Sequence, residues 1–116
     1  MPFRTNWTDE ASDQFEQLMQ AAVAARDKRA KQGVRKSTKA EGLFKQVEKC
    51  ISLLIENPRH PGLHTHRFYS MEHPYVADAH VYVAYAQNKT PGAYRVFWCY
   101  GPDRDVLTVI AITPHP

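Results

Sequence analysis

Residues 94–113 read YRVFWCYGPDRDVLTVIAIT, and this stretch decides the fold. Two runs rich in aromatic and β-branched residues, at 94–100 and 106–113, flank a Gly-Pro-Asp turn at 101–103. Aromatic and β-branched residues favour strands, whereas Gly and Pro between two close runs mark a reversal of the chain. We therefore predict a β-hairpin in which the two runs pair side by side.

The residues upstream predict two helices. Apolar side chains recur at helical spacing from the N-cap residue Thr8 to about residue 31. Thr38 and Glu41 have the spacing of a capping box, and they open a second apolar stripe that ends at the Asn-Pro pair at 57–58. Two amphipathic helices with a short connection predict an antiparallel helical hairpin.

Three weaker strand patterns, at residues 2–7, 64–71 and 79–86, complete the predicted sheet. Helices followed by successive strands are typical of the α+β class. We expect an antiparallel sheet with the helical hairpin packed on one face. The chain shows no repeat and no linker, so we expect a single domain over residues 1–116.

Charge is unevenly distributed along the chain. The 116 residues are 43% hydrophobic and carry a net charge of +3, which excludes a disordered tail or a disulfide-stapled miniprotein. Residues 26–49 hold nine Lys or Arg against three acids, so this block is +6 and the remainder −3. The block is either a solvated helix face or a surface for an anionic partner such as nucleic acid. The candidate contacts to an anionic partner, nucleic acid or an acidic protein segment, are Arg26, Lys28, Arg29, Lys31, Arg35, Lys36 and Lys39.

The two cysteines, Cys50 and Cys99, lie in apolar stretches. We expect buried free thiols rather than a disulfide, although the pair allows either. The first residues form no secretory signal, and no apolar run reaches the ~20 residues of a membrane span. We expect a soluble, cytoplasmic protein with no membrane partner.

The histidines are the first candidates for chemistry. His60, His64 and His66 fall within seven residues, and alternate residues of a strand share a face. No cysteine or acid cluster completes a metal shell, so we favour ordinary loop histidines over a metal site. The sequence also has no Gly-rich phosphate loop and no G-x-S-x-G motif, which argues against nucleotide-binding and acyl-transfer enzymes.

Two other residues carry a more specific hypothesis. Arg95 lies among aromatic residues of the predicted central strand, where burial of a guanidinium is costly. It either forms an ion pair, with Glu72 or Asp78, or binds an anion on the exposed face of the sheet. His115 directly follows the last strand, and a histidine there is either a frayed end or a general acid or base at the rim of the sheet.

In its layout and three short motifs, the chain resembles the RelE/ParE superfamily of toxins from bacterial toxin–antitoxin systems. The motifs are Leu-x-x-Asn-Pro-x-x-Pro-Gly-Leu at 54–63, Tyr-Arg-Val at 94–96 and Ile-Ala-Ile-Thr-Pro-His at 110–115. The resemblance implies a ribosome-dependent, metal-independent endoribonuclease that cuts mRNA and inhibits translation, with no cofactor. It also implies a cognate antitoxin, with the ribosome and mRNA as further partners.

The resemblance further implies roles for particular residues. Arg95 matches the strand arginine that stabilises the phosphate, and His115 matches the C-terminal catalytic histidine of YoeB-like members. With RNA as the partner, the predicted RNA contacts are the seven cations named in the basic block together with Arg67 and Lys89, which are isolated cations of the strand region. An apolar strip on the strands is one candidate surface for binding the antitoxin. The alternative is that these side chains belong to the hydrophobic core. The residues are Phe68, Tyr69, Tyr82 and Tyr85.

The chain also departs from the family pattern. The general-base glutamate of YoeB-like members falls near Pro61, with no acid there, so His64, His66 or Glu72 is left to substitute. Pro116 stands where a tyrosine follows the histidine. An alternative is therefore a non-catalytic protein of the same fold, either a gyrase inhibitor or an inactive toxin homologue. A third interpretation is an unrelated small α+β protein with a basic patch.

Overall fold

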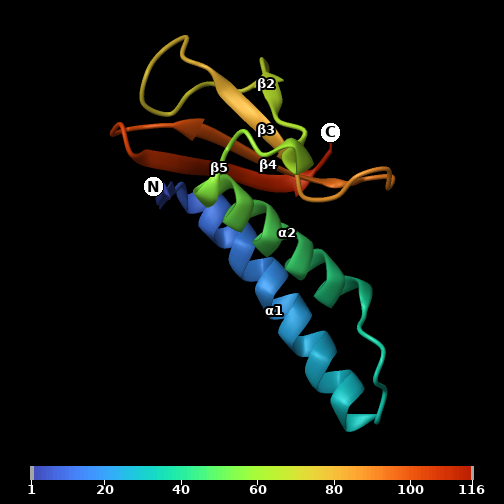
Figure 1. Ribbon diagram of the computed structural model, residues 1–116. Helices are drawn as coiled ribbons and strands as arrows, with labels where there is room; N and C mark the ends of the chain where they lie inside the picture. Colours follow the sequence, from blue (N-terminus) through green and yellow to red (C-terminus); the bar gives the residue numbers. More distant parts are fainter. Residues whose placement is uncertain (1, 116) are drawn as a thin grey trace.

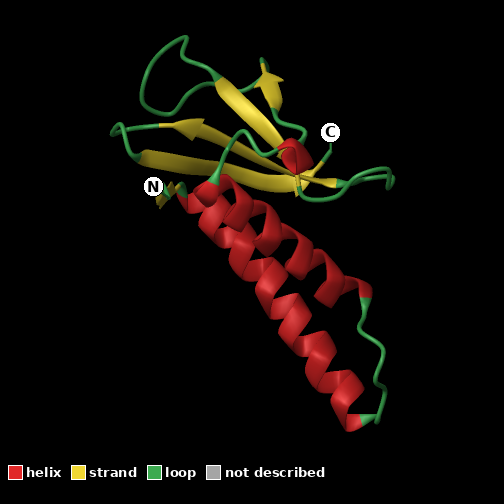
Figure 2. Ribbon diagram, in the orientation of Figure 1, coloured by secondary structure: helices red, strands yellow, loops and turns green. Residues whose placement is uncertain are grey.

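The computed structural model describes residues 2–115. The chain folds into a five-stranded sheet with a helical hairpin on one face (Figures 1 and 2). In chain order the elements are β1 (Arg4–Trp7), α1 (Asp9–Lys31), α2 (Lys39–Glu56), the 3-10 turn η1 (Pro61–Leu63), β2 (His66–Phe68), β3 (Val81–Tyr85), β4 (Tyr94–Tyr100) and β5 (Val106–Pro114). The predicted α+β class, the helical hairpin and the β4–β5 hairpin are confirmed. The strand predicted at 64–71 is reduced to three residues.

The strand order is β1-β5-β4-β3-β2, and every neighbouring pair but one is antiparallel. The exception is β1, which pairs in parallel with β5 at the edge of an otherwise antiparallel sheet. The backbone N–H of Arg4 donates to the Asp105 carbonyl at 2.9 Å, and the two side chains form an ion pair at 2.8 Å. A four-residue strand whose partner lies about 100 residues away has no local signal for its direction.

Both helices begin at the predicted caps. The Thr8 hydroxyl accepts from the Ala11 backbone N–H at 3.1 Å and donates to the Ile110 carbonyl at 2.6 Å, which also ties α1 to β5. The capping box of Thr38 and Glu41 is formed in full at the start of α2. No helix within residues 2–115 is long and apolar enough to cross a membrane.

The far end of the hairpin projects away from the sheet (Figure 1), and the molecule is elongated, at 51 × 26 × 25 Å. An ion pair joins the two helices there: Nε of Arg29 lies 2.9 Å from both carboxylate oxygens of Glu41. Nη1 of Arg29 also donates to the carbonyls of Val34 and Arg35 at 3.2 Å. Arg29 therefore holds the connection between the helices.

We expect this contact to make stability pH-dependent. The backbone N–H of Thr38 and the guanidinium of Arg29 hold the pKa of Glu41 below its ordinary value of 4.5. A lowered pKa stabilises the fold above that ordinary value, and the stabilisation disappears as the pH falls through the folded-state pKa. The free energy of unfolding should therefore decrease as the pH drops below about 4.5. Glu41→Gln should lower the free energy of unfolding at pH 7 and should make that free energy less dependent on pH in the acid range.

Urea denaturation at pH 7 and pH 3 measures the effect, and the exposed Glu48→Gln on the same helix is the matched control. Equal acid dependence in wild type and Glu41→Gln would contradict the prediction.

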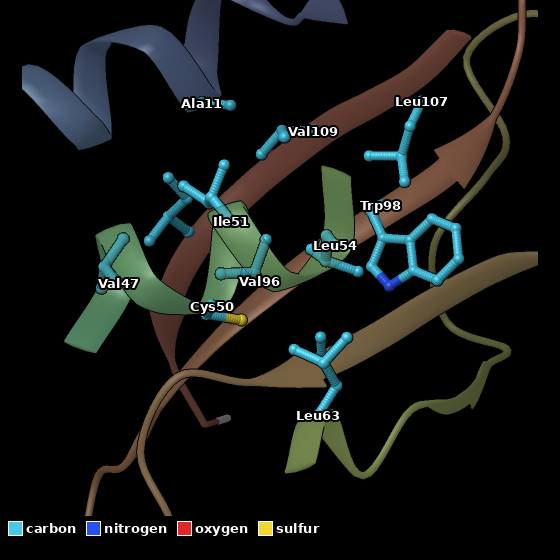
Figure 3. Close-up of a cluster of buried hydrophobic side chains, with 12 residues drawn as sticks. Ala11, Val47, Cys50, Ile51, Leu54, Leu63, Val96, Trp98, Leu107 and Val109 are labelled. Carbon is cyan, nitrogen blue, oxygen red and sulfur yellow. The ribbon is translucent and has the colours of Figure 1, made fainter. Parts of the chain in front are cut away.

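Each face of the sheet carries a buried cluster. On the face toward the helices, Leu54 of α2 and Leu63 pack with Trp98 of β4 and Leu107 of β5 (Figure 3). The opposite face, called the far face below, buries a smaller cluster, over which Phe68 and Met71 pack. Its buried members are Val81, Val83, Phe97, Cys99, Ile110 and Ala111.

Both cysteines are buried free thiols, as predicted. Burial raises the pKa of Cys50 to about 12 and that of Cys99 to about 11. Both thiols therefore stay protonated near neutral pH and behave as small apolar side chains.

Candidate functional site

A row of polar and aromatic side chains crosses the far face at one end of the sheet. Tyr85 of β3 lies opposite Arg95 of β4, and Arg95 lies opposite Thr113 of β5. On β2, His66 lies opposite Val83, two residues before Tyr85. Because partners across strands share a face and side chains alternate along them, the row from β2 to β5 is His66, Tyr85, Arg95 and Thr113.

Arg95 is the centre of this row. The residue is only 7% exposed, and its guanidinium carbon lies 3.6 Å from the centroid of the Tyr85 ring. Nη1 donates to the Gln87 carbonyl at 2.5 Å and to the Tyr94 carbonyl at 3.3 Å. The aromatic ring and these carbonyls fix the guanidinium in place on the far face.

The charge of Arg95 has no anionic partner within the described residues. No carboxylate of residues 2–115 forms an ion pair with it, so of the two alternatives left open by the sequence, the ion pair with Glu72 or Asp78 is not formed. Its buried Nε also has no hydrogen-bond partner among these residues. A buried cation is costly unless an anion neutralises it, and a planar guanidinium fits a phosphate best. Arg95 therefore has the chemistry of an anion site.

Two histidines contact the same tyrosine. The His64 and Tyr85 ring centroids are 5.3 Å apart and tilted by 33°, whereas His66 meets Tyr85 edge-on at 5.8 Å. His60 instead caps η1, its Nδ1 accepting from the Gly62 N–H at 3.0 Å. No group of three His, Cys, Asp or Glu residues between 2 and 115 is spaced to hold a metal ion.

His115 extends the pairing of β5 with β4 by one residue. Its backbone N–H donates to the Ala93 carbonyl at 2.8 Å, next to the pair formed by Tyr94 and Pro114. It is two residues beyond Thr113, the spacing at which side chains of a paired strand return to the same face. The pairing therefore brings His115 to the end of the sheet that carries Arg95, as expected from sequence. The end of β5 lies beside the β3–β4 loop (Figure 1).

No family model and no curated protein matches this chain in sequence. Solved structures match it in fold. The YoeB dimer from Staphylococcus aureus gives a TM-score of 0.61 at 8% identity, covering 100% of both chains. The chain has the RelE/YoeB toxin fold. The YoeB/ParE toxin from Agrobacterium tumefaciens gives a TM-score of 0.61 at 12% sequence identity, and the match covers 97% of this chain and 99% of that one. The intact E. coli RelBE toxin–antitoxin complex gives a TM-score of 0.54 at 12% sequence identity, and the match covers 98% of both chains.

On this RelE/YoeB fold, the predicted RNA contacts fall in three places. Six cations of the helical hairpin are exposed: Arg26, Lys28, Lys31, Arg35, Lys36 and Lys39. Arg29 differs from them because it is partly buried and its charge is paired with the buried Glu41, whereas the ion pair of Arg26 with Asp27, at 3.5 Å, is exposed. Lys89 is exposed in the β3–β4 loop, at the Arg95 end of the sheet, whereas Arg67 of β2 lies over the Tyr69 ring at 4.4 Å.

The aromatic residues proposed as an antitoxin strip do not share one surface. Phe68 packs on the far face against Phe97, at 4.8 Å between ring centroids. Tyr82 lies on the helix face, stacked on Trp98 at 4.9 Å. Tyr69 is 77% exposed beside them. A continuous strip is therefore excluded because alternation along β3 sends its tyrosines to opposite faces.

Tyr85 is the site residue that sequence reasoning missed, since it was assigned to that strip rather than to Arg95. The signal was present in the Thr-Pro-Gly turn at 90–92, which joins two strand patterns. Folding the strands about that turn brings Tyr85 near Arg95. The loop between them is long enough, however, to allow several registers, and the contact depends on which one forms.

Proposed function

We propose that this protein is the toxin of a toxin–antitoxin pair and that it cleaves mRNA on the ribosome, inhibiting translation. Two facts support the proposal. The RelE/YoeB fold extends over the whole described chain, and the helical hairpin, whose far end holds exposed lysines and arginines, projects from the sheet (Figure 1), which carries Arg95 on β4.

The observation that carries the proposal is the state of Arg95. It is a buried cation without a carboxylate partner in residues 2–115, at the centre of a row of polar side chains. A structural arginine is normally satisfied by an acid, whereas a phosphate-binding arginine is satisfied by its substrate. An RNA phosphodiester supplies the missing anion.

The reaction that fits is transesterification within the RNA. The 2′-oxygen forms a bond to the adjacent phosphorus, the bond from phosphorus to the 5′-oxygen breaks, and a cyclic phosphate and a 5′-hydroxyl remain. Arg95 stabilises the extra negative charge on the phosphate oxygens, a contribution that is often the largest in such reactions. His115 donates a proton to the leaving 5′-oxygen. The nucleophile belongs to the RNA itself, so these steps assign no role to a metal ion.

The exposed lysines and arginines of the hairpin provide the attraction to RNA. Hydrogen bonding between Gln87 and Gln46, at 2.9 Å, ties the β3–β4 loop to α2. This hydrogen bond joins α2 to the loop at the Arg95 end of the sheet, whereas the exposed cations lie at the far end of the hairpin, which projects away from the sheet. A basic surface at a distance from a phosphate site suits a large, highly charged RNA such as that of a ribosome.

An antitoxin is the second partner we propose. The E. coli structure is a complex of a toxin with its antitoxin. A partner that silences this chain would have to neutralise the basic hairpin or cover Arg95, and an acidic protein does either. We place both partners and the toxin in the cytoplasm, where mRNA is translated.

Expression of the chain alone is expected to arrest bacterial growth and to fragment mRNA. His115→Ala should relieve both effects by lowering the cleavage rate about 10²-fold or more, because proton transfer by a positioned side chain contributes that much. Growth curves and primer extension on cellular transcripts measure the outcome, with His80→Ala as a histidine control away from the site.

Growth arrest with intact transcripts would contradict the proposal. Arrest with DNA damage, unchanged in His115→Ala, would instead support a gyrase inhibitor of the same fold. No toxicity would favour an inactive homologue.

A further inference from the structure

The hydrogen bonding of His66 fixes which of its nitrogens carries the proton. Nδ1 of His66 lies 3.1 Å from the backbone carbonyl oxygen of His64. A carbonyl oxygen only accepts hydrogen bonds, so Nδ1 must be the donor. In a neutral imidazole this leaves Nε2 with its lone pair, which is the form that a base requires.

The position of His66 relative to Arg95 suits that chemistry. Both side chains lie on the far face, with the Tyr85 ring between their strands: His66 meets its edge at 5.8 Å and Arg95 covers it at 3.6 Å. On the opposite side of Arg95, Thr113 of β5 is its cross-strand partner, and His115 follows the end of β5, its backbone N–H bonded to the Ala93 carbonyl. A phosphate on Arg95 would therefore have His66 on one side and His115 on the other. In-line displacement needs this arrangement, because the attacking and leaving oxygens are on opposite sides of phosphorus.

The two other candidates for the base fit less well. His64 lies more nearly parallel to the Tyr85 ring, and its backbone is held in the left-handed region at φ 49° as the C-cap of η1. Among residues 2–115, no hydrogen bond to the ring of His64 fixes its tautomer as one does for His66. Glu72 lies in the loop between β2 and β3, where it lines a hollow of about 470 Å³ with His73 and Tyr75. Tyr75, which lines the same hollow, hydrogen-bonds Asn6 of β1 and Thr108 of β5, the two strands on the other side of the sheet from β2 and β3.

We propose that His66 is the general base of this protein, an assignment that rests on the proposed ribonuclease function. Nε2 of His66 takes the proton of the 2′-hydroxyl while the 2′-oxygen bonds to phosphorus. The bond to the 5′-oxygen breaks, and that oxygen receives its proton from His115. His66 then gives its proton to water and His115 takes one from water, so both histidines return to their starting states.

The test measures single-turnover cleavage of mRNA on programmed ribosomes by the purified protein. His66→Ala should lower the rate constant by about 10²-fold or more, and free imidazole in the buffer should restore part of it. Binding to ribosomes carrying a 2′-O-methyl mRNA should stay within about threefold of wild type, because removing a base affects proton transfer more than binding. His64→Ala is the discriminating variant and His80→Ala the control. Thermal unfolding confirms that each variant is folded.

The outcomes separate this assignment from the function on which it rests. Cleavage by wild type that survives in His66→Ala, or that is lost only in His64→Ala, overturns the assignment and leaves the function standing. Absence of cleavage by wild type overturns both. Nitrogen-15 NMR of the imidazoles gives a readout independent of activity: we expect the Nδ1–H tautomer at His66, and the Nε2–H tautomer would refute the proposal.

Discussion

Replacing Arg95 with alanine is expected to lower the rate of mRNA cleavage by about 10²–10³-fold, the usual cost of removing one preorganised group that stabilises developing charge. Arg95→Lys should recover only part of the rate. A lysine keeps the charge but loses the planar fork that matches two phosphate oxygens and stacks on Tyr85. Single-turnover cleavage on programmed ribosomes measures both variants.

The matched control for Arg95 is a side chain of similar length without the charge. Arg95→Met should be inactive, yet its free energy of unfolding should equal that of wild type or exceed it by about 0.5–2 kcal/mol. The substitution removes a buried cation whose Nε has no partner in the described chain. Urea denaturation of Arg95→Met and of wild type measures this difference in the free energy of unfolding. A variant destabilised by more than about 2 kcal/mol would show that Arg95 is needed for folding rather than held in place for a ligand.

Much of the fold was predictable because its signals are local. Thr8 and Thr38 are capping residues followed by apolar stripes, and both helices begin immediately after them. The strands at 94–100 and 106–113 carry strand-forming residues on both sides of a short turn. In each case the pattern and the structure it specifies lie within about 25 residues of one another, so periodicity and turn chemistry suffice.

The candidate site was predictable only in part because it depends on register. Arg95 stood out as a charge among aromatic residues, but the sequence left open whether it was paired with an acid. Its actual contacts are the Tyr85 ring and the Gln87 carbonyl, which depend on how β3 and β4 align. The His66 tautomer depends in turn on the carbonyl of His64, since the bend after η1 brings the two together. Local patterns do not encode such contacts.

The similarity to known toxins lies in the fold and not in the sequence, at 8–12% identity for the three structures described. A shared fold leaves activity open, because function depends on the groups that a fold positions. The distribution of charge along this chain bears on which groups the fold positions. Residues 26–49 carry a net charge of +6 and the remainder −3, while the charge of Arg95, which has no anionic partner within residues 2–115, lies on the sheet. The proposed function therefore assigns recognition of RNA to the hairpin and chemistry on RNA to the sheet.

The core that joins the hairpin to the sheet should be the most sensitive to truncation. Leu54 of α2 is fully buried and belongs to the same cluster as Leu63, Trp98 and Leu107 (Figure 3). Leu54→Ala is expected to lower the free energy of unfolding by about 2–5 kcal/mol, from lost apolar burial and from the cavity left between α2 and β4. Such a loss is a large fraction of the stability of a small domain.

Urea denaturation followed by circular dichroism measures that loss. The control is Ser52→Ala on the exposed side of the same helix, which should change stability by less than about 0.5 kcal/mol. Because Leu54 lies on the helix face and Arg95 on the far face, folded Leu54→Ala at low temperature should still cleave mRNA. A variant that kept full stability would show that α2 is not anchored to the sheet through Leu54. A variant that stayed folded but lost cleavage would show that the two faces of the sheet are coupled.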